Sequence, residues 1–366
     1  MTGPELTGSK IRWGIFGSGG IARRFAQDMR FSRTGVLAAV ASRSSENAQS
    51  FAQLFPGTKV FDDYRDLADS DQVDAIYVAT PNALHKDHSL IAINAGKAVL
   101  CEKPFACNAA EAREVAAAAA AANVFCMEAM WTRFLPIMAD LRQRIAAGEL
   151  GQVAHLEASL GFARTERPGD PITDPALGGG ALHDLGCYGM SIAEFLLGPF
   201  QLEGGSVERS ATGSSRTAAF VLSHAGEGEA ALSTISVSHA TQMRNMLVLS
   251  GSKSRITLEA PFIQAGYGTV SPVRFAEPGA VPGPSLRARL SNSLYGQKAK
   301  RMIRAVLPGH AKISAQFHGS GLQFEIDEVG TCLGSGRTVS RVMPPETTIS
   351  VLETLEKLDG SQASTS

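Results

Sequence analysis

A buried strand, a glycine turn and a helix start follow one another within the first two dozen residues. The apolar run 11–16 ends at Gly17, and an apolar pattern at helical spacing begins at Ile21. Gly17 allows a tight turn, Gly19 leaves room for a pyrophosphate, and Ala22 lets the helix lie close to the sheet. Because the first amides of such a helix bind phosphate, the segment predicts a dinucleotide site. The residues predicted to form it are Gly17, Ser18, Gly19, Gly20, Ile21 and Ala22.

The length and composition are those of a globular protein with two domains. The chain has 366 residues, of which 44% are hydrophobic and 19% are charged, and a domain typically takes about 100–150 residues. The net charge of -1 gives no field that would attract nucleic acid or a membrane surface. Six basic and no acidic residues fall within 287–304, and we interpret this run as a solvated helix face. We therefore expect neither nucleic acid nor a membrane as a partner.

The cysteines and the N-terminal segment favour a cytoplasmic protein. The five cysteines are widely spaced, with no C-x-x-C pair and no histidines at metal-ligand spacing. We therefore expect reduced thiols and no metal site. The N-terminus lacks a basic start followed by an apolar run, and no stretch approaches the roughly eighteen apolar residues of a membrane span. Secretion and membrane spanning are not expected.

Apolar runs and helical patterns alternate through residues 1–128. Strands are expected at 11–16, 36–41, 75–79, 98–101 and 124–127. Helices are expected to begin at Ile21, Ser45, Ala83 and Ala109. This alternation predicts an α/β fold in which 1–128 form a Rossmann domain with a doubly wound parallel sheet.

The pattern changes after residue 128. Longer segments alternate apolar and polar residues, as is typical of strands with one exposed face, at 153–160, 218–223, 230–236 and 246–249. Helices are expected over 181–197, 322–333 and 347–358, a loop over 261–284, and a disordered tail over 360–366. We therefore predict that 129–366 form a second α/β domain with an open, largely antiparallel sheet.

Three residues after the second predicted strand bear on the choice between NAD and NADP. They are Ser42, Arg43 and Ser44. An NAD enzyme normally offers a carboxylate here to the ribose hydroxyls, whereas a guanidinium with two hydroxyls suits a 2′-phosphate. We therefore expect NADP. NAD stays open, because Arg43 could instead stack on the adenine.

Ligands of a doubly wound sheet lie beyond the carboxyl ends of its strands, so the residues that follow each strand are candidates. After the run 75–79 we expect Thr80 and Pro81 beside the ribose, and Asn82 or His85 toward the nicotinamide. His85 could equally cap or pack a helix. After the run 98–101 the chain places Glu102 and Lys103 at the same edge, with the lysine near the nicotinamide. The cofactor-binding residues predicted here are Thr80, Pro81, Asn82, His85, Glu102 and Lys103.

A glycine-led segment over 178–190 is the second cluster of chemically interesting residues. Asp184 and Tyr188 are four apart, so a helix places both on one face, whereas His183 lies off that face and is interpreted as packing or solvated. The two glycines inside the helix each cost about 1 kcal/mol relative to alanine, which suggests close approach of another element. A polar pair in an apolar helix needs partners or a ligand.

Lys103, Asp184 and Tyr188 together allow hydride transfer coupled to proton transfer. A substrate hydroxyl would lose its proton to a base while its carbon gives hydride to the nicotinamide. Tyrosine has a pKa of about 10 and is a poor base unless a cation stabilises the phenolate, which Lys103 can do. Asp184 would orient the lysine or the substrate. We predict these three as the catalytic residues.

These features together resemble the glucose-fructose oxidoreductase, inositol dehydrogenase and rhizopine catabolism family, called Gfo/Idh/MocA. The matching elements occur in the family's order across nearly the whole chain. They are the glycine turn at 17–22, Thr80-Pro81-Asn82 with His85, Glu102-Lys103-Pro104, and the helix that carries Asp184 and Tyr188. The resemblance implies a Rossmann domain followed by an α/β domain, whose open sheet commonly forms the interface of a homodimer or homotetramer.

Tyr188 stands where inositol dehydrogenase-like members carry a histidine. Together with the segments 128–136 and 324–333, it resembles the branch of dimeric dihydrodiol dehydrogenases and NADP-dependent xylose dehydrogenases. The branch implies a Lys103–Tyr188 catalytic pair with Asp184 beside it. It also implies a substrate pocket bordered by Trp131, Arg133, Phe134, Asp184 and Tyr188. From the residues alone, 131–134 would be a domain-junction core with a surface arginine, and 261–310 departs from the branch in being long and basic.

The resemblance and the residues together favour an NADP-dependent oxidoreductase that acts on a sugar or cyclic diol. The substrate class would be an aldose oxidised at its anomeric carbon or a trans-dihydrodiol. One alternative is an NAD-dependent glycosidase that cycles through oxidation, elimination and reduction. Another is a cofactor-binding regulator, which would have no need of the Lys103, Asp184 and Tyr188 set.

Overall fold

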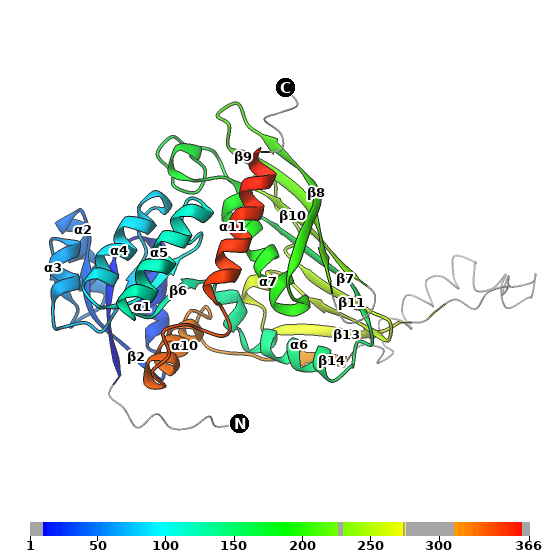
Figure 1. Ribbon diagram of the computed structural model, residues 1–366, viewed down its shortest axis with the longest axis horizontal. Helices are drawn as coiled ribbons and strands as arrows, with labels where there is room; N and C mark the ends of the chain where they lie inside the picture. The colour runs from blue at the N-terminus through cyan, green and yellow to red at the C-terminus, as the bar shows by residue number, and fades with distance from the viewer. Residues whose placement is uncertain (1–9, 226–229, 274, 276–310, 361–366) are drawn as a thin grey trace, which may run out of the picture.

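Two β-sheets lie side by side, and the last helix of the described chain lies between them (Figure 1). The computed structural model describes residues 10–225, 230–273, 275 and 311–360. The predicted basic run 287–304 and nearly all of the predicted tail lie outside these residues. None of the described helices combines the length and apolar character that a membrane crossing requires.

The first sheet has six parallel strands in the order β3-β2-β1-β4-β5-β6. This confirms the predicted doubly wound sheet, and the order reverses between β1 and β4, where such sheets bind ligands. The strands are β1 (Ile11–Phe16), β2 (Gly35–Ala41), β3 (Lys59–Phe61), β4 (Ala75–Val78), β5 (Ala98–Glu102) and β6 (Cys126–Ala129). The helices between them are α1 (Gly20–Met29), α2 (Ser45–Leu54), α3 (Tyr64–Asp69), α4 (His85–Asn94) and α5 (Ala109–Ala122), with a 3-10 turn η1 (Asn82–Leu84).

Local sequence explains why these elements form where they do. Every residue of β4 and β5 is buried, as expected for parallel strands covered on both faces by helices. The Ser44 and Asn108 side chains accept hydrogen bonds from amides in the first turns of α2 and α5. The strand predicted at 124–127 is β6, which begins two residues later than expected. Strand β3 and helix α3 were not predicted, because each is too short to give a periodic signal.

The second sheet has eight strands in the order β14-β13-β12-β11-β7-β10-β9-β8. Of the strand pairs that the structure describes in this second sheet, only β7–β10 is parallel, which confirms a largely antiparallel sheet. The strands are β7 (Val153–Gly161), β8 (Phe200–Arg209), β9 (Ser215–His224), β10 (Ala231–Ser238), β11 (Leu247–Gly251), β12 (Ser254–Leu258), β13 (Tyr267–Pro272) and β14 (Ala311–Ser314). Buried and exposed residues alternate along β9 and β10, so one face of the sheet is packed.

The predicted loop over 261–284 is wrong at its start. It contains the 3-10 turn η5 (Phe262–Gln264) and strand β13, which pairs with both β12 and β14. Gly268 in this strand lies close to β12, because a Cβ there would lie 2.7 Å from the Leu258 side chain and 3.1 Å from the Thr257 carbonyl oxygen. Strands β8, β12 and β14 were not predicted either.

The helices of the second half lie against both sheets. They are the 3-10 turn η2 (Trp131–Phe134), α6 (Pro136–Ala146), the 3-10 turn η3 (Pro175–Leu177), the π-helical turn η4 (Leu182–Gly186), α7 (Cys187–Leu197), α10 (Gln323–Gly334) and α11 (Pro345–Gly360). Helix α10 contacts α1 and β2 of the first sheet, and α11 contacts α5 as well as α7 and β8. The division into domains 1–128 and 129–366 stays a prediction. Helices α10 and α11 belong to 129–366 by sequence, yet they pack against elements of the first sheet.

Candidate active site

The glycine turn after β1 has the geometry that a dinucleotide needs. Gly17 has φ +101°, and a Cβ there would lie 2.6 Å from the Ala79 carbonyl oxygen. A Cβ on Gly19 or Gly20 would meet nothing within 4 Å, so the space in front of the helix is open. Gly19 caps α1 without any side-chain hydrogen bond. The first amides of α1 are therefore free to bind a pyrophosphate, and the residues present fit that group.

The residues after β2 divide into two roles. Ser18 donates a hydrogen bond from Oγ to Ser42 Oγ at 3.1 Å, which ties the glycine turn to the end of β2. Ser44 caps α2 by accepting from the Asn47 amide. Arg43 is exposed and therefore free to turn toward a phosphate on the adenosine ribose. Its charge also acts on Tyr64, although burial is the larger effect and raises the pKa of that phenol.

The His85 side chain is a structural tie rather than a nicotinamide contact. The ring is fully buried, with Nε2 2.8 Å from the Thr80 carbonyl oxygen and Nδ1 2.7 Å from the Pro104 carbonyl oxygen. Burial lowers the pKa of His85, so the neutral ring donates to one of these carbonyls at a time. It thereby holds together the loops that follow β4 and β5.

Two further residues of these loops have assigned partners. The amide of Asn82 donates to the Gly178 carbonyl oxygen at 3.5 Å, which links η1 to the glycine-led segment. Glu102 is buried and accepts hydrogen bonds from the Tyr77 hydroxyl and from the Lys103 amide. Burial raises the pKa of Glu102, and its partners offset only part of that effect. Glu102 therefore anchors the backbone of Lys103.

Lys103, Asp184 and Tyr188 come together although they belong to different elements. The Lys103 ammonium donates to Asp184 Oδ1 at 2.5 Å and to the Asp184 carbonyl oxygen at 2.8 Å. It also lies 4.9 Å from the centroid of the Tyr188 ring. Asp184 belongs to the π-helical turn η4 and Tyr188 to α7, so the predicted single helix is irregular at its start. A π-helical turn inside a helix is often found at a functional site.

The environment fixes the charges of this trio. Burial alone would raise the pKa of Asp184, but Lys103 and His239 outweigh it, so the pKa is well below its usual range. Burial alone would lower the pKa of Lys103, but Asp184 and Tyr188 hold it well above its usual range. Burial raises the pKa of Tyr188 more than Lys103 lowers it. The trio is therefore an ionised aspartate, an ammonium and a neutral phenol.

Of the residues predicted to border the substrate, Trp131 lies against the trio. Its indole N–H donates to the Tyr188 hydroxyl oxygen at 2.8 Å. Because an indole nitrogen only donates, the phenol must direct its own proton elsewhere. Tyr188 can therefore offer that proton to a substrate oxygen.

Arg133 and Phe134 do not lie against the trio in this way. Arg133 is 2% exposed and bonds Ser191 on α7, pairs with Glu194 and donates to the Val342 carbonyl oxygen. It joins α7 to the C-terminal segment, and it is not the surface residue that its charge alone suggests. Phe134 lines a separate cleft of about 410 Å³ that contains none of the trio.

His183 and His239 show what the sequence could and could not reveal. His183 is mostly covered and lies 3.9 Å from the Asp359 carboxylate, consistent with a packing role. His239 was not predicted, yet its Nε2 lies 3.0 Å from Asp184 Oδ2. It directly follows β10, and the packing of β10 against η4 brings it to Asp184, which no local pattern in the sequence shows. No three histidine, cysteine, aspartate or glutamate side chains gather at a metal site within the described ranges.

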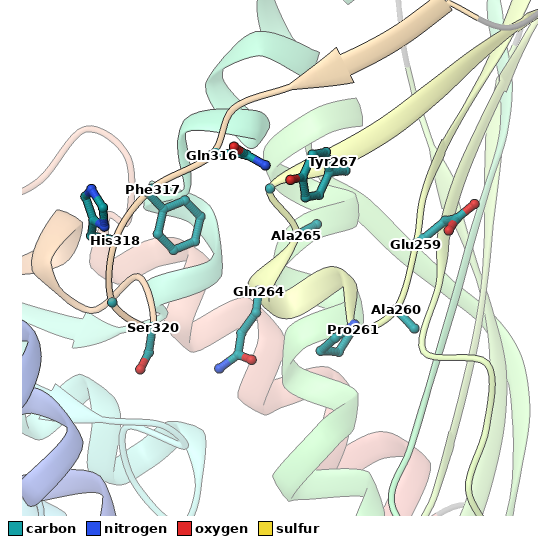
Figure 2. Close-up of a pocket in the computed structure, with 12 residues that line it drawn as sticks. Glu259, Ala260, Pro261, Gln264, Ala265, Tyr267, Gln316, Phe317, His318 and Ser320 are labelled. Carbon is teal, nitrogen blue, oxygen red and sulfur yellow. The ribbon is translucent and has the colours of Figure 1, made fainter.

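A hollow larger than the cleft beside Phe134 lies between the segments 259–267 and 316–320. It has a volume of about 860 Å³ and is lined by residues 259–261, 264–267 and 316–320. Figure 2 shows Gln264, Phe317 and Ser320 at its wall, and none of the trio lines it. This hollow is distinct from the candidate active site.

Comparison with known proteins identifies the family. A family described as "Oxidoreductase family, NAD-binding Rossmann fold" matches residues 11–130, and the "GFO/IDH/MocA C-terminal domain" matches residues 138–257. The D-xylose 1-dehydrogenase (NADP(+)) of Hypocrea jecorina is 29% identical and covers 95% of this chain and 90% of its own. The human trans-1,2-dihydrobenzene-1,2-diol dehydrogenase is 36% identical over 69% of this chain and 75% of its own.

A solved structure shares the fold of this chain. A 3-ketoreductase from Actinomadura kijaniata in complex with NADP and TDP-benzene has a TM-score of 0.76 and 22% identity, over 96% of this chain and 97% of its own. The predicted α/β fold is confirmed, and the relatives confirm the predicted oxidoreductase class. This chain belongs to the Gfo/Idh/MocA oxidoreductase family.

Proposed function

We propose that this chain is an NADP-dependent oxidoreductase that transfers hydride between the cofactor and a hydroxyl or carbonyl carbon of a sugar or cyclic diol. The observation that carries the proposal is the Lys103 ammonium, held by Asp184 against the ring of Tyr188. The relatives that act on D-xylose and on a trans-dihydrodiol support the substrate class.

The residues of this chain divide the chemistry among them. When bound, NADP⁺ accepts hydride from the substrate carbon. In that direction Tyr188 removes the proton of the substrate hydroxyl, and in the reverse direction it returns a proton to the carbonyl oxygen. Lys103 stabilises the phenolate, and Asp184 keeps the ammonium in place. Trp131 fixes the phenol oxygen, so that its proton faces away from the indole.

The cofactor would lie along the predicted residues of the first sheet. The open turn at 17–22 would hold the pyrophosphate, and Arg43 would bind the 2′-phosphate that distinguishes NADP from NAD. Thr80, Pro81 and Asn82 follow β4 and would lie beside the ribose. An NADP-dependent relative and NADP-bound neighbours support this choice of cofactor.

The function is tested by following NADP reduction with a panel of aldoses, inositols and trans-dihydrodiols, with NAD run in parallel. We expect turnover of an aldose or a trans-dihydrodiol with NADP and weaker turnover with NAD. Absence of turnover across the panel, with NADPH bound, would contradict the proposal and favour a regulator. A cofactor that copurifies and never exchanges would favour the redox-cycling glycosidase.

We also propose that the chain works in the cytoplasm as a homodimer or homotetramer. All five cysteines are unpaired thiols, which supports a reducing compartment. The outward face of β10 carries Leu232, which is 43% exposed, opposite the buried Ser233 and Ile235. This face supports an interface between copies through the second sheet.

We predict that Leu232→Arg weakens this assembly, because a charge placed in an apolar contact must be desolvated. Sedimentation velocity of both proteins at several concentrations measures the effect. We expect the variant to shift toward monomer with an unchanged melting temperature. A wild-type monomer at all concentrations would contradict the assembly.

A further inference from the structure

His239 enters the candidate site from the second sheet. It follows β10, is 5% exposed, and places Nε2 3.0 Å from Asp184 Oδ2. Its backbone amide donates to the Arg216 carbonyl oxygen at 2.8 Å, and its carbonyl oxygen accepts from the Arg164 amide at 2.9 Å. These two backbone hydrogen bonds therefore fix His239 just beyond the end of β10.

The surroundings of the ring indicate where its proton lies. Asp184 is ionised and only accepts, so the nitrogen that faces it must carry the hydrogen. The other nitrogen, Nδ1, is buried and has no hydrogen-bond partner among the described residues. A hydrogen on Nδ1 would be a buried donor without an acceptor, which is unfavourable. The nitrogen that faces Asp184, Nε2, is therefore the donor of this contact.

We propose that His239 is a positioning residue for Asp184. Its Nε2–H occupies Oδ2, which leaves Oδ1 and the backbone carbonyl of Asp184 to hold the Lys103 ammonium. The chain of contacts runs from the second sheet through Asp184 and Lys103 to the ring of Tyr188. This inference rests on the proposed roles of Lys103 and Tyr188.

The contacts of Asp184 explain why a fixed donor matters at this position. Asp184 and Lys103 form a pair with no net charge, and the proton of Tyr188 responds to the field of the ammonium. His239 fixes the carboxylate through a hydrogen bond to the oxygen that Lys103 does not use. Without it, Asp184 can rotate and the ammonium can leave the tyrosine ring. The loss should therefore appear in the chemical step and not in cofactor binding.

The test compares His239→Ala and His239→Gln with the wild-type enzyme. The glutamine amide can donate from a position similar to that of Nε2. We expect His239→Ala to lower kcat by about tenfold or more, the scale of a lost outer hydrogen bond, with KM and NADPH affinity unchanged. We expect His239→Gln to recover most of that loss. A recovery of this kind is expected if the alanine variant lacks the donor to Asp184.

His224→Ala is the matched control. His224 is also a buried histidine at a strand end of the second sheet, and its nitrogens bond the Gly198 carbonyl oxygen and Ser233 Oγ. It makes no contact with Asp184 among the described hydrogen bonds. We expect His224→Ala to lower the melting temperature while kcat stays close to wild type. An equal fall of kcat in His224→Ala and His239→Ala would overturn the inference.

Two further measurements separate this inference from the proposed function. Nitrogen-15 NMR of the histidine rings should show a hydrogen on Nε2 of His239, and an Nε2 without a hydrogen overturns the inference whatever the kinetics. Lys103→Met and Tyr188→Phe are measured in parallel. If both abolish turnover while His239→Ala does not, only the positioning role fails. If both retain turnover, the proposed catalytic roles and the inference built on them fail together.

Discussion

Lys103 can serve Tyr188 because Asp184 compensates for the burial of the lysine. Asp184 keeps the lysine charged, and the lysine lies against the face of the tyrosine. Two features of the sequence were enough to select all three residues: a position just after a predicted strand for Lys103, and helical spacing for Asp184 and Tyr188. His239 was missed because it contacts Asp184 across 55 positions of the chain, from a strand end of the other sheet. Spacing along one element cannot reveal such a contact.

Tyr188→Phe should lower turnover by about a hundredfold or more, the usual scale for a lost acid/base group, while NADPH binding stays intact. Because burial raises the pKa of Tyr188, the phenolate fraction grows as the pH rises from neutral to alkaline. The kcat/KM of oxidation should therefore rise over that range, whereas residual activity of Tyr188→Phe should not. Steady-state kinetics of both proteins across pH checks this, and a parallel rise in the variant would assign the base to another group.

Arg43→Ala should weaken NADPH binding by about tenfold or more, which corresponds to loss of a hydrogen bond to a charged group. NADH has no 2′-phosphate, so its binding should change little. Fluorescence titration with both cofactors measures the difference. Arg23→Ala is a matched control, because Arg23 is another exposed arginine, on α1. Equal losses for NADPH and NADH would mean that Arg43 only stacks on the adenine.

At the scale of elements, the predictable parts were those with a strong local signal. Strand β1 and helix α1 follow from an apolar run, a glycine turn and helical spacing. Strand β3 has only three residues, and β13 contains a glycine, Gly268, that lies close to Leu258 of the neighbouring strand. Local pattern cannot separate such a glycine from a loop glycine, because the cause lies in the neighbouring strand.

The two glycines near Tyr188, Gly186 and Gly189, differ in how closely a neighbouring element approaches them. A Cβ on Gly189 would lie 2.6 Å from Ile235 Cγ2, whereas a Cβ on Gly186 would meet its nearest neighbours at 3.4 Å. We predict that Gly189→Ala forces α7 away from β10, lowers stability by about 1–3 kcal/mol and reduces kcat.

Gly186→Ala is its control. It should be neutral or stabilising by up to about 1 kcal/mol, the helix propensity gained. Urea unfolding measures the free energy of unfolding of the two variants, and steady-state kinetics measures their kcat. A stable, fully active Gly189→Ala would show that α7 does not need this close contact.

For the whole molecule, the important feature is the return of the chain to the first sheet. Asp327 of α10 is 7% exposed and accepts hydrogen bonds from Ser32 Oγ at 2.7 Å and from the Arg33 amide at 2.8 Å. From their place in the sequence, helices α10 and α11 were assigned to the second domain. The sequence could not show that they also pack against helices and strands of the first domain. Such long-range contacts are set by tertiary structure.

Asp327→Ala should lower the free energy of unfolding by about 1–3 kcal/mol, since it leaves buried donors without an acceptor. Glu353→Ala removes an exposed ion pair with Arg113 and should cost less than about 1 kcal/mol. Chemical unfolding of both variants measures the two values. Equal values would mean that the contact between α10 and the first sheet contributes little.

Helix α11 contacts α5 of the first sheet, and α7 and β8 of the second half. It is synthesised after Lys103, Asp184 and Tyr188 have all left the ribosome. A nascent chain arrested before residue 345 would thus hold every proposed catalytic group, yet lack the helix that lies between the two sheets. We therefore expect activity to appear late in translation, as a property of the last helix to dock.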